Sequence, residues 1–139
     1  MGIVIDVNLD DVPFEMPPIP TGDYDLRTEE EPTYEENKNK NGHNIVVTWK
    51  IVNHPDPLLN GMTVKDWLAV STLMGRIRLK TVLRAAGLNP DQKQVSTADL
   101  HGITVRATIK EESVLDKATG IRSSRSNIAG YLDPATAGA

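Results

Sequence analysis

The sequence predicts one mainly β domain with a single helix. Three observations lead to this fold class: several segments alternate apolar and polar residues, one segment places apolar residues at helical spacing, and turn-forming residues separate them. The chain of 139 residues has the length of one ordinary domain. We expect an N-terminal arm with a Pro-rich connector at 1–21, the domain at 22–134, and a disordered tail at 135–139.

The arm begins with IVIDVNLD, residues 3–10, in which apolar and polar residues alternate. This period predicts a half-buried strand. The prolines of residues 13–20 then interrupt regular structure, because proline neither donates to a sheet ladder nor continues a helix. Such a strand either closes the domain's own sheet or adds to a neighbour's sheet, so the arm is a candidate for homo-oligomerisation.

Within the domain, period-two alternation predicts five strands, at residues 22–27, 43–53, 62–71, 102–112 and 127–134. We expect polar loops or flexible connections between them, including residues 37–42 and 115–126. Trp49 shares its strand face with three aliphatic residues, which favours a place in the core. Tyr24 and Tyr131 are also interpreted as structural.

The helix is predicted over GRIRLKTVLRAAGL, residues 75–88, with Ser71 or Thr72 as its N-cap and Gly87 as its stop. Leu79, Val82, Leu83 and Ala86 fall on one side and are expected to face the core. Three basic residues lie four apart beside that face: Arg76, Lys80 and Arg84. This row is either a solvated helix surface or a site that binds an anion.

Three strands, a helix and two further strands form the running order of an OB-fold. The predicted fold is therefore a mainly β, five-stranded OB-fold barrel with the helix between strands three and four, plus the extended arm.

Charge is divided unevenly along the chain. Residues 1–36 contain eleven acidic residues and one basic residue, whereas residues 37–139 contain eight acidic and fourteen basic residues. This asymmetry indicates either nucleic-acid contact or pairing between the two parts of the chain. The sequence has no cysteine, no apolar run long enough for a membrane span and no signal peptide, so we expect a cytoplasmic protein without membrane contact.

No pattern of side chains indicates an enzyme. The three histidines lack metal-ligand spacing, no Gly-rich phosphate loop is present, and no serine lies in a nucleophile elbow. We therefore expect no catalytic residue, no metal and no cofactor.

Non-specific binding of single-stranded nucleic acid requires cations along the phosphates and exposed aromatics that stack on bases. Trp67 breaks the apolar parity of its strand and lies beside Lys65, and Tyr34 lies in a polar loop. The predicted groove contains Trp67, Lys65, Lys50, Arg106 and Lys110, with Tyr34, Arg122 and Arg125 on flanking loops and Arg76, Lys80 and Arg84 along the helix.

Several segments, in this order, resemble a family of phage-encoded single-stranded DNA-binding proteins, formerly of unknown function and now assigned an OB-fold. They are PTGDYDLR, HNIVVTWKIVN, NGMTVKDWLAV, GRIRLKTVLRAAGL, DLHGITVRATIKEE and SNIAGYLDP, and they span residues 20–134. The resemblance implies that the protein coats single-stranded DNA during phage DNA replication and recombination in the host cytoplasm, with no enzymatic activity or metal. Replication or recombination proteins are possible partners.

The chain departs from the expected pattern in two respects. Its stacking aromatics are few, so affinity is expected to depend on phosphate contacts more than usual. The other departure is from single-stranded DNA-binding proteins of the bacterial type. Its acidic excess lies near the N-terminus, whereas those proteins end in an acidic tail. The alternative function is a protein-interaction or virion-assembly module on an OB-like barrel, which the alternating arm and the acidic pI of about 5.3 favour.

Overall fold

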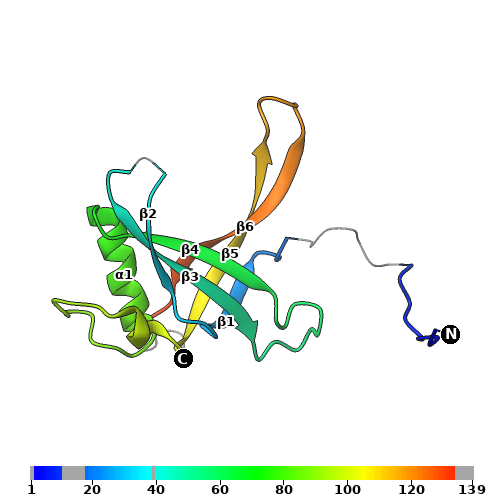
Figure 1. The fold of residues 1–139 in the computed structure, drawn as a ribbon, viewed down its shortest axis with the longest axis horizontal. Coiled ribbons are helices and arrows are strands. Elements are labelled where there is room, and N and C mark those ends of the chain that lie inside the picture. The colour runs from blue at the N-terminus through cyan, green and yellow to red at the C-terminus, as the bar shows by residue number, and fades with distance from the viewer. Residues whose placement is uncertain (1, 11–17, 39, 134–139) are drawn as a thin grey trace.

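A computed structural model describes residues 2–10, 18–38 and 40–133 of the chain. Figure 1 shows a curved sheet with one α-helix packed at one end. The elements in chain order are β1 (Gly22–Arg27), β2 (Thr33–Glu36), β3 (His43–Val52), β4 (Thr63–Ala69), α1 (Leu73–Ala85), the 3-10 helix η1 (Thr97–Leu100), β5 (Thr104–Leu115) and β6 (Arg122–Tyr131). No helix in these ranges has the length and apolar character that crossing a membrane requires.

All strand pairs are antiparallel, in the order β2-β3-β1-β5-β6, and β4 pairs with the other edge of β3. β2 and β1 share one edge of β3: β2 pairs with His43–Val46 and β1 pairs with Lys50–Val52. The sheet is not closed, because no ladder joins β4 to β6 in the described part of the chain.

The mainly β class and the single α-helix are confirmed, but the predicted count of five strands is wrong. The additional strand is β2, whose four residues are all exposed. A short polar edge strand has no apolar alternation, so only its pairing with β3 defines it.

The core lies inside the curve of the sheet, and α1 covers one end of it (Figure 1). Trp49 and Leu68 are fully buried there, and Val82 and Leu83 of α1 pack against them within one cluster. The predicted core position of Trp49 is confirmed. Tyr24 and Tyr131 are also buried, at 5% and 6% exposure.

The structure confirms Thr72 as the N-cap of α1 and Gly87 as its stop, although the helix spans Leu73–Ala85 and not residues 75–88. The Thr72 hydroxyl caps the helix by accepting from the Gly75 N–H at 3.0 Å. At the other end, Gly87 adopts a positive φ of 77°, and the N–H groups of Gly87 and Leu88 donate to the carbonyls of Arg84 and Leu83. These two bonds form a Schellman motif, which satisfies carbonyls that the helix leaves free.

The structure corrects two expectations. Residues 2–10 form no strand and are exposed, because no sheet edge of the described chain pairs with them. The segment expected as a flexible connection, residues 115–126, instead belongs to a long β5–β6 hairpin that projects from the sheet (Figure 1). Its polar residues satisfy their main-chain groups by pairing with each other. Residues 13–17 of the expected Pro-rich connector and the expected tail at 135–139 lie outside the described residues.

Candidate nucleic-acid interface

Trp67 lies on the outer face of the sheet and is 57% exposed. On β4, Val64, Asp66 and Leu68 point into the fold, so strand alternation directs Trp67 and Lys65 outward. Across the ladder, Trp67 pairs with Val46 of β3, which is nearly buried on the same face. The exposed indole can therefore stack on an aromatic ring of a ligand that approaches from the solvent side.

Trp67 lines three hollows among the described residues. The hollow toward α1 contains Arg78 as its one charged lining residue in that part of the chain, and Arg78 already pairs with Asp66. The other two hollows differ in charge. The first, of about 560 Å³, lies between β4 and β6, and Lys65 and Arg125 line it together with Trp67. The second, of about 430 Å³, lies toward β2 and contains Lys38 but also Glu35 and Glu36. Because carboxylates repel phosphates, the hollow between β4 and β6 is the side that suits a polyanion.

Hydrogen bonds to β6 hold the base of the hollow between β4 and β6. Ile19 is 3% exposed and lines the hollow. Its N–H donates to Ser126 Oγ at 2.6 Å, and the same hydroxyl donates to the Ile19 carbonyl at 2.9 Å. The chain before β1 is therefore fastened to β6 beside Arg125 and Asn127, and these contacts position the walls of the hollow.

Two of the predicted loop cations lie on a strand instead. Arg122 and Arg125 belong to β6, opposite Leu115 and Glu112 of β5. The Glu112 carboxylate accepts from the Asn127 amide at 2.7 Å. Lys110 pairs with Asn127 across the same ladder, so it lies next to the hollow, on the neighbouring strand.

Four predicted DNA-binding cations are paired with carboxylates. Lys80 lies 2.8 Å from Asp91, Arg106 2.9 Å from Asp25, Lys50 3.5 Å from Glu29, and Arg84 3.7 Å from Asp133. Intramolecular pairing, the alternative explanation of the charge asymmetry, thus accounts for Arg106 and Lys50, which pair with residues of the acidic N-terminal part. Exposed pairs of this kind contribute little stability, but they reduce the charge available to a phosphate.

The other predicted cations have no carboxylate within 4 Å among the described residues; they are Lys65, Arg76, Lys110, Arg122 and Arg125. Arg76 donates from Nε to the Val70 carbonyl at 2.8 Å. Arg122 donates to Ser113 Oγ at 3.5 Å. Only Lys65 and Arg125 of these five line the hollow beside Trp67.

Tyr34 does not lie near Trp67. The loop position expected for it is wrong, because it belongs to β2, where it pairs with Ile45. Ile45 faces the core, so Tyr34 lies on the face of the sheet opposite Trp67. Its ring is 57% exposed and stacks on His43, with centroids 4.8 Å apart and planes 5° from parallel. The structure therefore separates the two aromatics that the sequence assigned to one groove.

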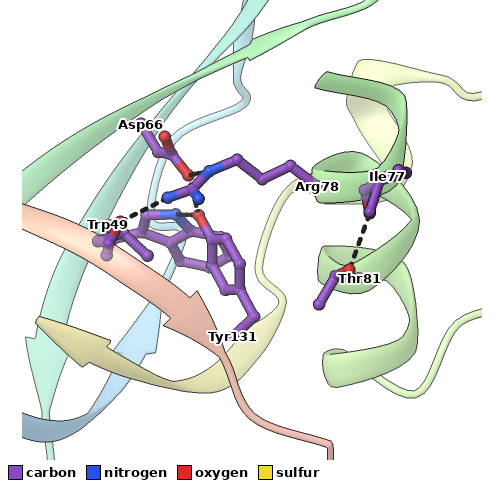
Figure 2. A network of polar contacts seen from close by, with 7 residues as sticks. Trp49, Asp66, Ile77, Arg78, Thr81 and Tyr131 are labelled. Carbon is purple, nitrogen blue, oxygen red and sulfur yellow. Dashed lines mark hydrogen bonds and ion pairs between the residues drawn. The ribbon is translucent and has the colours of Figure 1, made fainter. Parts of the chain in front are cut away.

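A largely buried polar network links β4 to β6 (Figure 2). Arg78 of α1 donates to Asp66 Oδ2 of β4 at 2.8 Å and to the Ile128 carbonyl of β6 at 2.6 Å. Tyr131 donates its hydroxyl to the same Asp66 oxygen at 2.6 Å and accepts from Trp49 Nε1 at 2.9 Å. One guanidinium thus joins the two strands that no ladder joins.

The environment of this network raises the pKa of Tyr131 well above its usual value. Burial is the main cause, followed by the nearby Asp66 carboxylate, which also accepts the phenolic hydrogen bond. The guanidinium of Arg78 lies 5.5 Å from the Tyr131 ring centroid.

Sequence reasoning did not find this network. The available signal was Asp66 itself, a carboxylate at an inward position of an alternating strand between Val64 and Leu68. A buried carboxylate requires a hydrogen-bond donor or a cation as its partner. Arg78 was the candidate, because it lies on the next element, α1, and does not belong to the row of Arg76, Lys80 and Arg84.

The described residues contain no cluster of three or more side chains able to hold a metal ion. No protein-family model matches the chain, and no curated protein matches it.

Proposed function

We propose that this protein binds single-stranded DNA without sequence specificity and coats it during phage DNA replication and recombination. The observation that carries the proposal is the exposed indole of Trp67 at a hollow that Lys65 and Arg125 also line. An unpaired strand needs this combination, because each base offers a flat ring for stacking and each phosphate a negative charge.

The topology supports the same proposal. Without β2, the strands follow the order β4-β3-β1-β5-β6, with α1 between β4 and β5 along the chain. We propose that this is an OB-like barrel left open between β4 and β6, where Arg78 takes the place of a ladder. The protein would act by binding alone, with no catalytic step, in the host cytoplasm.

Tryptophan fluorescence tests the proposal directly. Trp49 is fully buried, so quenching by oligo-dT would report on Trp67. We expect strong quenching by single strands and little by duplex. Trp67→Ala should remove the quenching and weaken binding by roughly 1–3 kcal/mol, the contribution of one stacked base.

A salt titration locates the phosphate contacts. Replacing Lys65 and Arg125 with alanine should reduce the slope of log affinity against log salt by about 1.4, since each phosphate contact on a single strand contributes about 0.7. The matched control is Lys80→Ala with Arg84→Ala, which removes the same charge from α1. A larger slope change in the control would place the DNA along the helix row and would reject the β4–β6 hollow.

A protein-interaction or virion-assembly module remains the second candidate. Leu73, Met74 and Ile77 of α1 are 51–76% exposed, and Met74 and Ile77 line a hollow together with Trp67. Exposed apolar side chains gathered at one place are typical of protein contacts. Absence of any fluorescence response to single-stranded DNA and RNA would favour this candidate.

A further inference from the structure

Another hollow lies on the other side of the sheet from Trp67, between α1, β2 and residues 90–97. We call it the α1 groove; its volume is about 900 Å³. Its floor consists of core side chains, including Ile45 and Leu83 at 4% and 3% exposure, and half-buried Leu79 and Val95 join them. An opening that reaches the core suits an apolar occupant.

The rim of the α1 groove is basic. Arg76, Lys80 and Lys93 line it, and Asp91 is the one acidic residue among the described lining residues. Asp91 already pairs with Lys80 at 2.8 Å. Arg76 and Lys93 have no carboxylate within 4 Å in the described ranges. The groove therefore combines an apolar floor with cations left for an acidic partner.

The arm has the complementary character. Five of its apolar side chains are 63–94% exposed: Ile3, Val4, Ile5, Val7 and Leu9. In an extended segment, Ile3, Ile5, Val7 and Leu9 point to one side, and Asp6 and Asp10 point to the other. The arm therefore complements the α1 groove: its apolar row suits the apolar floor, and its acidic side chains suit the basic rim.

We infer that the arm in the α1 groove comes from a second copy of the chain. Residues 18–21 are hydrogen-bonded to the base of the β5–β6 hairpin. The main chain of Ile19 bonds to Ser126 Oγ, and Thr21 Oγ1 accepts from the Glu111 N–H. Figure 1 shows this segment entering the domain on the side away from α1. The arm thus leaves the domain on the side away from its own α1 groove. In a two-fold symmetric dimer that exchanges arms, the arm of each copy would fill the groove of the other.

We propose that residues 3–10 of a second copy lie in the α1 groove, with the apolar row on the floor and Asp6 and Asp10 at the basic rim. The acidic arm is then the partner of the row formed by Arg76 and Lys80. This inference does not depend on DNA binding, because the groove and Trp67 lie on opposite faces.

The test measures mass by light scattering on the full chain without DNA. We expect twice the 15.2 kDa of one chain at high concentration. Ile5→Asp with Val7→Asp should weaken the dimer by at least about tenfold, as loss of a central apolar contact does. Val4→Asp with Asn8→Asp is the matched control, since it adds the same two charges on the opposite side of the arm and should weaken dimerisation less. All four positions are exposed, so the domain stays folded.

A mixing experiment distinguishes exchange between copies from docking within one copy. The groove variant is Arg76→Glu with Lys93→Glu, at exposed positions, and circular dichroism verifies its fold. Each variant alone should be monomeric, but a mixture should form dimers, because the intact arm of the groove variant binds the intact groove of the arm variant. A monomeric wild-type chain, a dimer unaffected by the arm variant, or no dimer in the mixture would each overturn the proposal.

Discussion

Replacing Arg78 with methionine tests the role of the guanidinium that joins β4 to β6. Methionine keeps most of the aliphatic stem but removes both donors, the Nε bond to Asp66 at 2.8 Å and the Nη2 bond to the Ile128 carbonyl at 2.6 Å. Asp66 then keeps the Tyr131 hydroxyl as its hydrogen-bond donor. A nearly buried carboxylate loses its cation, which is the costly half of breaking an ion pair.

The magnitude follows from the burial of the two partners. Removing one member of a fully buried pair costs about 3–5 kcal/mol. The side chains of Arg78 and Asp66 are 31% and 12% exposed, so water partly replaces the lost contact. We expect the free energy of unfolding to fall by about 2–4 kcal/mol, a large share of the roughly 5–15 kcal/mol of a typical domain.

Urea unfolding followed by tryptophan fluorescence measures this loss. Arg76→Met is the matched control on the same helix, because Arg76 is exposed and has one bond to a carbonyl; we expect a change within about 0.5 kcal/mol. Adding Asp66→Asn to Arg78→Met should restore part of the stability, with a coupling energy of about 1–3 kcal/mol. Equal losses for Arg78→Met and Arg76→Met, or a coupling energy near zero, would refute the reasoning.

Three further predictions concern stability. The pKa of Tyr131 is raised above its usual value of 10.0, so the unfolded chain loses the phenolic proton at a lower pH than the folded chain does. Stability should therefore fall as pH rises past about 10, and Tyr131→Phe should weaken that dependence in alkaline unfolding curves. An unchanged curve for Tyr131→Phe would contradict this prediction. Gly75→Ala should lower the free energy of unfolding by about 1–3 kcal/mol, because its Cβ would clash with the Ala69 carbonyl oxygen; a neutral effect in urea would show that the helix shifts freely. Trp67→Ala, at an exposed position, should change the urea midpoint little while it removes DNA quenching, and a loss above about 2 kcal/mol would show that the indole serves the fold.

Much of the fold was predictable because its signals are local. The alternation of residues 43–53 defined β3 and the burial of Trp49, and Thr72 and Gly87 marked the ends of α1. The periodicity of apolar residues and the capping of a helix depend on residues close together in sequence, so both can be recognised in a single sequence. The same signal failed at β2 and at the β5–β6 hairpin, where polar strands form through pairing partners distant in sequence.

The candidate site was only partly predictable. Strand parity correctly directed Lys65 and Trp67 outward, but it did not reveal that Tyr34 lies on the opposite face or that Arg106 pairs with Asp25. Each of those outcomes depends on which strand lies beside which, and composition does not specify that order.

By itself, the sequence determined the class of this protein, its one α-helix, the outward direction of Trp67 and the division of charge between an acidic beginning and a basic body. Only the tertiary structure decided that the sheet stays open between β4 and β6, that Arg78 and Asp66 join those strands, and which cations remain for a partner. The physical reason is the range of each interaction: side-chain periodicity acts over a few residues of chain, whereas ion pairs and ladders form between groups that folding alone brings together.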